Sequence, residues 1–278
     1  MPDLTIRTLG QETVLLDGLE PEWRADSART LLFYLLGHPD GLPHGTIVQA
    51  LWNPEPGGAS IACLRVAVCR LRAALGDPGS VVTDRQRYRL ALPVLERADT
   101  FQFTRDLHLA RRGPPRQRIA AYGRALAHYA GDHLPLEQGE WAQPLRAQLC
   151  GDAAQAGLEL SILLGQDGQP GAALEALAAA LRRDPLISER WHQDLMIGLA
   201  AQDRYAAVEH YRRYVRYLRA EVGDTPMRET TALAQRIKDG LPPGTARAPG
   251  DGSAFAVPAI ASASVSLPNP VPERWGRA

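Results

Sequence analysis

Three arginines, Arg65, Arg70 and Arg72, lie within one short segment of this 278-residue chain. An arginine guanidinium always carries a positive charge and presents its N–H donors in a planar fork. That fork can form two hydrogen bonds with the edge of a guanine base, or it can bind a phosphate oxygen. Arginine supplies all but one of the 31 basic residues, so an arginine-rich surface is also consistent with an ordinary solvated face. The secondary structure that carries these side chains distinguishes a nucleic-acid contact from a solvated surface.

The apolar residues of the same segment predict a helix over 59–75. They recur at alternating spacings of three and four, at Ile61, Leu64, Val68, Leu71 and Leu75. Such a stripe faces a core. The side chains on the other side then point outward, namely Ala62, Arg65, Cys69 and Arg72, with Arg70 flanking them. We therefore expect a helix that fits the major groove of DNA, where the small residues allow close approach.

The run VVTDRQRYRLAL that follows predicts a β-hairpin over 81–92. Arg85, Arg87 and Arg89 lie at its tip and along its descending strand. A basic helix followed directly by a basic hairpin is the arrangement with which a winged helix contacts duplex DNA. Residues 59–92 contain six arginines and only two aspartates, although the whole chain has a formal net charge of zero. The sequence thus favours double-stranded DNA as a partner.

The elements before this helix fit the same interpretation. Residues 4–9 and 13–16 predict a short antiparallel hairpin. Asp26 and Ser27 can cap a following helix. Thr46–Trp52 predicts a second helix, with Pro43 close to its start. The order of two strands, three helices and a hairpin is that of a winged helix.

After residue 100 the strand signals disappear and Ala- and Leu-rich helices dominate. We expect them near 100–112, 116–130, 141–165, 170–183, 187–201, 204–221 and 227–239. A shift of 34 residues relates Ala173 to Ala207 and Leu177 to Tyr211, which indicates tetratricopeptide-like repeats. The fold class expected is mainly α, with an N-terminal α+β winged helix-turn-helix followed by an all-α tetratricopeptide-like domain. The predicted boundaries are 1–96 and 97–240, with a flexible Pro-, Ala- and Ser-rich tail over 241–278.

Charged and aromatic residues of the helical half are interpreted as surface and core, respectively. We expect a solvent-facing set of arginines at Arg212, Arg213, Arg216 and Arg219. A contact of this surface with RNA polymerase or with the winged helix is the alternative. Trp141, Trp191 and Tyr205 are expected in the core, although the concave side of such repeats can also bind a peptide or a small effector.

Several classes of protein are not indicated. No run of about 18 apolar residues predicts a membrane span. The start, MPDLTIRTLG, lacks a signal-peptide pattern, so we expect a cytoplasmic protein with no membrane partner. The three cysteines, Cys63, Cys69 and Cys150, form no CxxC pair and have no histidine at zinc spacing. We expect them to be small buried or neutral residues, without a disulfide or a metal.

Enzyme signatures are equally absent from the sequence. It contains no HExxH, GxSxG, GxGxxG or Walker A pattern. His128 and His133 flank Asp132 in HYAGDH, which predicts a helix end and a turn. We therefore expect no catalytic residue, no cofactor and no metal, and we expect a protein that is not an enzyme.

Two family resemblances rest on these motifs. Residues 4 to about 92 resemble the OmpR-type winged helix, in IVQALW, VCRLRAAL, VVT and YRL. Residues 98–240 resemble the bacterial transcriptional activator domain, in RADTFQF, HYAGDHLP, DPLISERWHQDLMIGLAAQDRYAAVEHYRRY and LRAEVGDTP. The combination in this order is similar to the antibiotic-regulatory (SARP-type) activators. The resemblance implies a nucleoid-associated transcriptional activator that binds promoter repeats, whose helical half contacts RNA polymerase, a second copy of the chain, or both.

The resemblance also implies roles for individual residues. Arg70 and Arg72 match positions where related winged helices contact DNA, with Arg65 nearby, and the wing contacts fall on Arg85, Arg87 and Arg89. Arg87 departs from the family pattern, because glycine usually precedes the tyrosine. Either the wing turn is reshaped, or the extra arginine contacts a phosphate. Pro43 also replaces the usual hydroxyl cap.

A rival function of another class is a signalling scaffold. In that alternative the tetratricopeptide-like half binds a protein, and the winged helix is itself a protein-interaction module that does not read DNA. A DNA-binding assay separates the two hypotheses.

Overall fold

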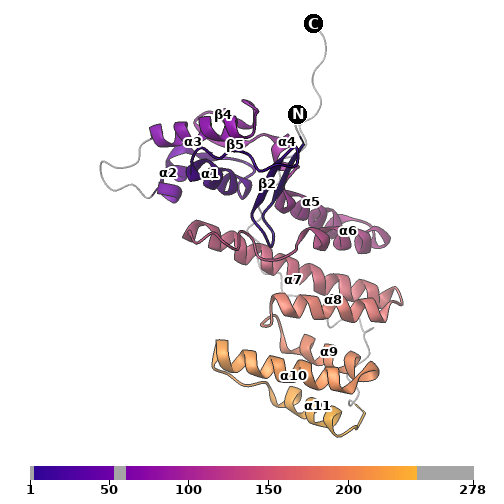
Figure 1. Ribbon diagram of the computed structural model, residues 1–278. Coiled ribbons are helices and arrows are strands. Elements are labelled where there is room, and N and C mark those ends of the chain that lie inside the picture. Colours follow the sequence, from indigo (N-terminus) through magenta and orange to yellow (C-terminus); the bar gives the residue numbers. More distant parts are fainter. Residues whose placement is uncertain (1–2, 53–60, 243–278) are drawn as a thin grey trace.

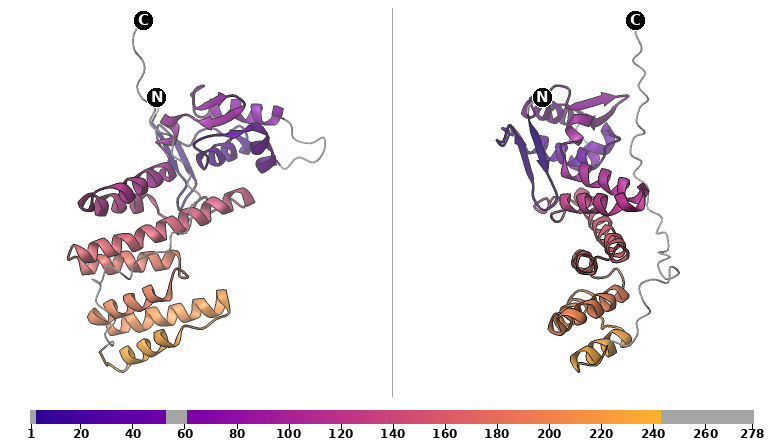
Figure 2. Two further views of the ribbon diagram at one scale, coloured as in Figure 1. Left: turned by 180° about the vertical axis from the view of Figure 1, so that it is seen from behind. Right: turned by 90° about the vertical axis from the view of Figure 1, so that its right-hand side faces the viewer.

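We describe the fold from a computed structural model, which defines residues 3–52 and 61–242. The N-terminal part combines short strands with three main helices, and the helical part extends from it as a stack of helices (Figures 1 and 2). This arrangement confirms the predicted fold class. The tail expected over 241–278 lies outside the described residues from position 243 onward, as do positions 59 and 60 of the helix expected over 59–75.

The first two strands join the N-terminal part to the helical part. Strands β1 (Leu4–Arg7) and β2 (Thr13–Leu16) form an antiparallel pair. The predicted first strand, 4–9, is two residues too long. The main-chain N–H groups of Thr8 and Leu9 donate to the carboxylate of Asp99 instead of pairing with β2. The hairpin is thereby attached to the first helix of the helical part.

Three helices follow, α1 (Asp26–Leu36), α2 (His44–Trp52) and α3 (Ile61–Ala74). The expected capping of α1 by Asp26 or Ser27 is wrong, because Ala25 occupies the N-cap position without a side-chain hydrogen bond. Asp26 instead lies in the first turn, where its negative charge faces the positive end of the helix dipole.

Pro43 lies close to the start of the second helix, as expected, but outside its first turn. It is the last residue of a short strand, β3 (Leu42–Pro43), and α2 begins at His44. Leu42 pairs with Tyr88 and Pro43 with Arg87. A proline is tolerated here because β3 is an edge strand of its sheet.

The basic hairpin forms the rest of this sheet. Strands β4 (Val81–Asp84) and β5 (Arg87–Leu90) pair in antiparallel register, and β5 is central in the order β3, β5, β4. The hairpin predicted over 81–92 is therefore present. A short helix that the sequence analysis did not predict, α4 (Leu92–Leu95), follows it directly.

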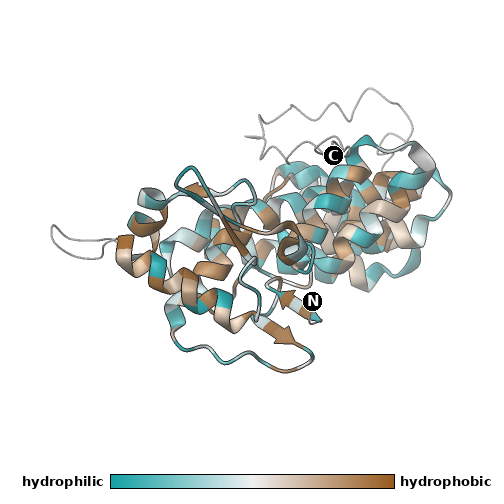
Figure 3. Ribbon diagram, turned by 90° about the horizontal axis from the view of Figure 1, so that it is seen from above, coloured by the Kyte–Doolittle hydropathy of each residue, from teal (hydrophilic) through white to brown (hydrophobic). Residues whose placement is uncertain are grey.

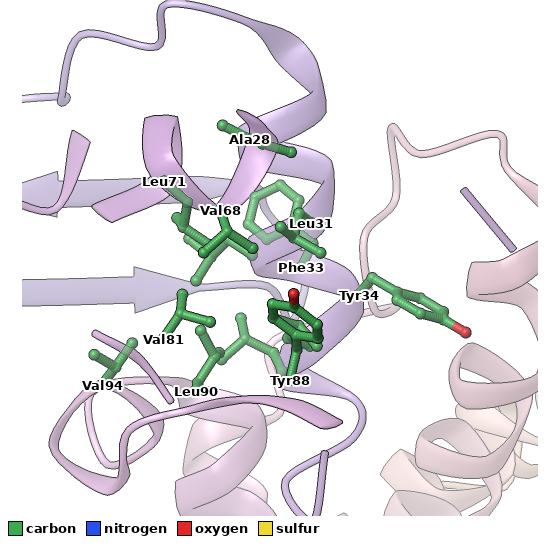
Figure 4. Packing of buried hydrophobic residues seen from close by; sticks show 14 of the residues in the cluster. Ala28, Leu31, Phe33, Tyr34, Val68, Leu71, Val81, Tyr88, Leu90 and Val94 are labelled. Atoms are coloured by element: carbon green, nitrogen blue, oxygen red, sulfur yellow. The ribbon is translucent and has the colours of Figure 1, made fainter. Parts of the chain in front are cut away.

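One hydrophobic core holds these elements together (Figure 4). Helices α1 and α3 and the hairpin all contribute to it, with Leu31, Val68, Leu71, Val81, Tyr88 and Leu90 among its buried side chains. Tyr34 points away from the other labelled side chains (Figure 4). Its ring meets that of Trp141 edge-on, with centroids 5.5 Å apart. Tyr34 thus connects the core of the N-terminal part with the helical part.

The helical part contains the expected helices, with boundaries that differ by a few residues. They are α5 (Asp99–Arg112), α6 (Pro115–His128), α7 (Gln143–Gln166), α8 (Pro170–Arg183), α9 (Glu189–Gln202), α10 (Arg204–Tyr217) and α11 (Arg228–Lys238). A 3₁₀ turn, Glu140–Ala142, precedes α7, and a π turn, Leu218–Val222, follows α10. Small residues let the helices approach closely, since a Cβ atom at Gly157 would lie 2.9 Å from that of Ala180.

Some side chains differ from their expected burial. Tyr205, expected in the core, is 76% exposed. Cys63 is exposed, Cys69 is exposed as expected for the outward face of α3, and Cys150 is half-buried. Trp141 and Trp191 are half-buried and pack against the core, as expected. The four arginines of the α10 region, Arg212, Arg213, Arg216 and Arg219, are exposed as expected.

Hydrophobic and hydrophilic residues alternate along the helices (Figure 3). This pattern is typical of amphipathic helices that bury one face. Within residues 3–52 and 61–242, no helix is both long and apolar enough to cross a membrane.

Candidate nucleic-acid interface

The exposed face of α3 carries most of the side chains singled out in the sequence. Leu64, Ala67, Val68 and Leu71 bury the opposite face. Ala62, Arg65, Cys69 and Arg70 are exposed. In the described part of the chain, neither Arg65 nor Arg70 forms an ion pair or a side-chain hydrogen bond. Their guanidinium donors are therefore available to a ligand.

Arg72 is not on the open face, contrary to expectation. It is half-buried, and its Nη2 donates a 2.6 Å hydrogen bond to the carbonyl oxygen of Val81 at the start of β4. Its Nε is buried without a partner. The cause is packing: the last turn of α3 lies against the hairpin, so a long side chain at this position reaches the strand. Arg72 joins the helix to the hairpin.

The tip of the hairpin is a two-residue turn. Arg85 and Gln86 both have positive φ angles, 44° and 67°. Turns of this kind match the twist of the paired strands and usually contain glycine or asparagine. The positive φ angles lie at these two residues and not at Arg87, and the turn displays the exposed side chain of Arg85.

Arg87, the residue that departs from the family pattern, has a structural contact. Its Nη2 donates a 2.5 Å hydrogen bond to the carbonyl oxygen of Gly41, in the turn before β3. Gly41 has a φ of 75°, and a Cβ atom there would lie 2.8 Å from the Tyr88 carbonyl oxygen. Arg87 remains exposed, so this bond fixes the hairpin without removing the arginine from the surface.

Arg89 completes the basic surface of the hairpin. Along β5, exposed Arg87 and Arg89 alternate with buried Tyr88 and Leu90. This alternation follows from the period of two in a strand. Arg85 and Arg89 form no ion pair with a described residue. We use the term reading surface for Ala62, Arg65, Cys69, Arg70, Arg72, Arg85, Arg87 and Arg89 together.

An open hollow of about 540 Å³ lies between α3 and the hairpin. Arg65, Cys69 and Arg72 line its helix side, and Thr83 and Tyr88 line its strand side. Helix and hairpin therefore face the same space, as a double-stranded ligand that spans both would require. In the described ranges, no group of three or more His, Cys, Asp or Glu side chains could hold a metal ion.

A buried carboxylate that the sequence analysis did not single out fixes the segment after β1 to the helical part. Asp99 is 1% exposed and accepts hydrogen bonds from the N–H groups of Thr8, Leu9 and Thr100, at 2.8–3.0 Å. The hydroxyl of Thr8 also donates to it, at 2.9 Å. The segment RADTFQF contains Asp99, but nothing in its composition shows that a segment about 90 residues earlier supplies the donors.

Arg146 of α7 holds the other side of this junction. Its Nε donates to the carbonyl oxygen of His133 at 2.7 Å, and its Nη2 donates to those of Leu134 and Glu137. The N–H of Leu134 in turn donates to the Thr8 carbonyl oxygen at 2.8 Å. His133 is fully buried, and burial together with the Arg146 charge lowers its pKa to about 4. HYAGDH thus forms the predicted turn, and this turn is part of the junction.

Comparison with protein families gives one matching model, the bacterial transcriptional activator domain, over residues 98–238. Two curated proteins are similar in sequence. Transcriptional regulatory protein MoaR1 of Mycobacterium bovis is 24% identical over 223 residues, which are 76% of this chain and 71% of that protein. Regulatory protein AfsR of Streptomyces coelicolor is 31% identical over 199 residues, which are 69% of this chain but only 20% of that protein.

A solved structure shares the fold. Mycobacterium tuberculosis EmbR, in complex with a low-affinity phosphopeptide, superposes with a TM-score of 0.63 and 23% sequence identity. The match covers 87% of this chain and 66% of that chain.

Proposed function

The chain belongs to the bacterial transcriptional activator domain family, as a SARP-type transcriptional regulator, and from this premise we propose that it activates transcription by binding promoter DNA in a sequence-specific manner. Helix α3 enters the major groove of a promoter repeat, and the β4–β5 hairpin contacts the adjacent backbone. The observation that carries this proposal is the hollow between α3 and the hairpin, which is lined by arginines on the helix side.

The residues of the reading surface have different roles in this proposal. Arg65 and Arg70 contact base edges, while Ala62 and Cys69 allow the helix to approach them. Arg85 and Arg89 contact phosphates. Arg72 and Arg87 each donate a hydrogen bond from one guanidinium nitrogen to a main-chain carbonyl oxygen, that of Val81 and that of Gly41, respectively. We assign them a positioning role in addition to any phosphate contact through their remaining N–H groups.

We propose the domain division that the sequence predicts, with 1–96 as the winged helix, 97–240 as the bacterial transcriptional activator domain and 241–278 as a tail. Most buried residues of one core cluster lie between Leu4 and Ala98, which supports this division. Leu134 also belongs to that cluster, and Leu9 packs in the core of the helical part, so the two parts share a packed junction. The helical part contacts RNA polymerase, a second copy of the chain, or both. We also propose that the protein acts in the cytoplasm at the nucleoid, by binding and without catalysis.

Binding to the promoter region upstream of the protein's own gene tests the proposal. Fluorescence anisotropy with that DNA, at two salt concentrations and with unrelated competitor DNA, should show salt-sensitive and competitor-resistant binding. Arg65→Ala and Arg70→Ala should each weaken it. The control Arg219→Ala removes an equally exposed arginine far along the chain from α3 and should bind like the wild type.

The same assay addresses the scaffold alternative. If the wild-type protein shows no competitor-resistant binding at either salt concentration, the DNA-reading proposal is wrong. A folded winged helix that does not bind DNA would leave protein interaction as its function. Equal binding by Arg65→Ala, Arg70→Ala and the wild type would instead show that α3 is not the reading helix.

A further inference from the structure

Three side chains outside the reading surface meet where α6 ends, α7 passes and α8 ends. They are Tyr129, Cys150 and Arg183. The Cys150 Sγ donates a hydrogen bond of 3.4 Å to the carbonyl oxygen of Arg183, the last residue of α8. The guanidinium carbon of Arg183 lies 5.5 Å from the centre of the Tyr129 ring. Cys150 as a whole residue is half-buried.

Two hydrogen-bond donors of this cluster lack an acceptor. Tyr129 is 95% buried, since its exposed fraction is 5%, and its hydroxyl faces the Cys150 side chain without forming a hydrogen bond of normal geometry. The Nη1 of Arg183 is also buried without a partner. In the part of the chain that the structure describes, no carboxylate forms an ion pair with Arg183. A buried donor without an acceptor is destabilising, so a site that keeps two of them is suited to a ligand or modification that supplies an acceptor.

The electrostatics keep both groups in their donor forms. Burial raises the pKa of Tyr129, and the nearby negative charge of a Cys150 thiolate raises it further. Burial lowers the pKa of Arg183, whereas Tyr129 and Cys150 act in the opposite direction. The phenol therefore stays protonated beside the thiol, and Cys150 has a guanidinium cation as its neighbour. A guanidinium beside the sulfur can stabilise negative charge on an oxygen that is added to it.

We propose that Cys150 is a peroxide-reactive thiol, whose sulfenic acid form Tyr129 and Arg183 stabilise. The thiolate sulfur attacks one oxygen of hydrogen peroxide, the S–O bond forms and the O–O bond breaks. The second oxygen leaves as water after taking up a proton. The sulfur loses two electrons and the peroxide gains them. The oxygen added to sulfur is the acceptor that the Tyr129 hydroxyl and the Arg183 Nη1 lack.

Oxidation has a structural consequence. The S–H group that donates to the Arg183 carbonyl oxygen is consumed, so the end of α8 loses its hydrogen bond to α7. The modification thus acts on the packing between these two helices, within the helical part and away from the reading surface.

Cys63 provides an internal reference for the test. The full-length protein is treated with hydrogen peroxide in the presence of dimedone, which traps sulfenic acids, and peptide mass spectrometry follows the labelling of each cysteine. Cys63 is exposed and Cys150 only half-buried, so accessibility alone would make Cys63 react faster. We expect labelling at Cys150 to be about fivefold faster or more, because the Tyr129 hydroxyl and the Arg183 guanidinium stabilise the oxygen that is added to sulfur. Labelling of Cys150 that is no faster than that of Cys63 overturns the proposal.

Two variants separate stabilisation by the cluster from general reactivity. Tyr129→Phe removes the hydroxyl and keeps the ring, and Arg183→Met removes the charge and keeps the length. Each should slow labelling of Cys150 about threefold or more and leave Cys63 unchanged. Arg219→Met removes an exposed arginine far along the chain from the cluster, so it is the control and should have no effect. If Arg183→Met does not fold, the labelling rate of Cys150 in Tyr129→Phe alone tests the proposal. An unchanged Cys150 rate in the folded variants contradicts the proposed roles.

Discussion

The guanidinium of Arg72 is bonded to the carbonyl oxygen of Val81, so the last turn of α3 and the first residue of β4 are held together. This bond lies directly beside the hollow that we propose as the DNA site. The orientation of the hairpin relative to α3 therefore depends on this side chain as well as on the hydrophobic core between them.

Replacement of Arg72 by alanine should therefore affect both folding and binding. The Val81 carbonyl loses its donor, and we expect the free energy of unfolding to fall by about 0.5–1.5 kcal/mol. DNA affinity should fall as well, because the hairpin is less well positioned. Urea denaturation and anisotropy measure the two effects. Arg65→Ala is the comparison: it should weaken DNA binding with little change in stability, because Arg65 is exposed and forms no bond within the described chain.

The salt dependence of binding should distinguish helix from hairpin. Arg85→Ala and Arg89→Ala remove proposed phosphate contacts, so each should lower the slope of log affinity against log salt by about 0.9 and weaken all DNA sequences alike. Arg65→Ala and Arg70→Ala should reduce discrimination between the promoter site and a mutated site by about 1–3 kcal/mol. A salt titration on both DNA sequences gives both quantities. Loss of discrimination in the hairpin variants, but not in the helix variants, would reverse the assignment.

The periodic parts of this interface could be predicted from the sequence. The stripe of apolar residues in α3 and the alternation in β5 both leave a repeating signal, so the exposure of Arg65, Arg70 and Arg89 follows from spacing alone. Bonds between distant segments leave no such signal. Nothing at Arg72 shows that it reaches Val81, and the bond from Arg87 to Gly41 depends on a two-residue strand that is too short to have a period.

Asp99 should be one of the side chains most important for the junction. Asp99→Ala leaves the N–H groups of Thr8, Leu9 and Thr100 without their shared acceptor in a buried site. We expect the free energy of unfolding to fall by about 3 kcal/mol or more, because several hydrogen bonds to a charged group are lost together. Urea denaturation measures this. Asp3→Asn is the control: its ion pair with Arg97 is exposed, so the change should stay below about 1 kcal/mol. Equal effects of the two substitutions would show that Asp99 is not a structural centre.

Gly41 should tolerate no side chain. Gly41→Ala meets two penalties, a φ of 75° and a Cβ position 2.8 Å from the Tyr88 carbonyl oxygen. Gly18→Ala meets only the first, because it has a φ of 81° and nothing within 4 Å of the new Cβ. The left-handed conformation costs roughly 1–2 kcal/mol in both. We expect Gly41→Ala to lose at least about 1 kcal/mol more than Gly18→Ala, and to bind DNA more weakly, because the hairpin shifts. Equal losses in thermal or urea unfolding would mean that the backbone relaxes around the clash.

The last prediction concerns pH and follows from buried histidines. His133 has a pKa of about 4 because burial and the Arg146 charge disfavour its protonated form. Burial also lowers the pKa of His210 to about 4, with smaller contributions from the charges of His192 and Arg213. In the unfolded chain the pKa of histidine is about 6.5. Between about pH 6.5 and 4 the unfolded state therefore takes up protons that the native state does not, and stability must fall as the pH falls.

Urea denaturation from pH 7.5 to 4.5 should show this loss in the wild type. His133→Leu removes one of the groups responsible, so its stability should depend less steeply on pH, by up to about 1.4 kcal/mol per pH unit. Only the slope is informative, because the substitution also changes packing. Leu134→Ala controls for this: it creates a cavity at the neighbouring, fully buried position without removing a titrating group. It should be less stable at every pH, with the slope of the wild type. If His133→Leu also keeps that slope, His133 is not the buried neutral base that its environment requires.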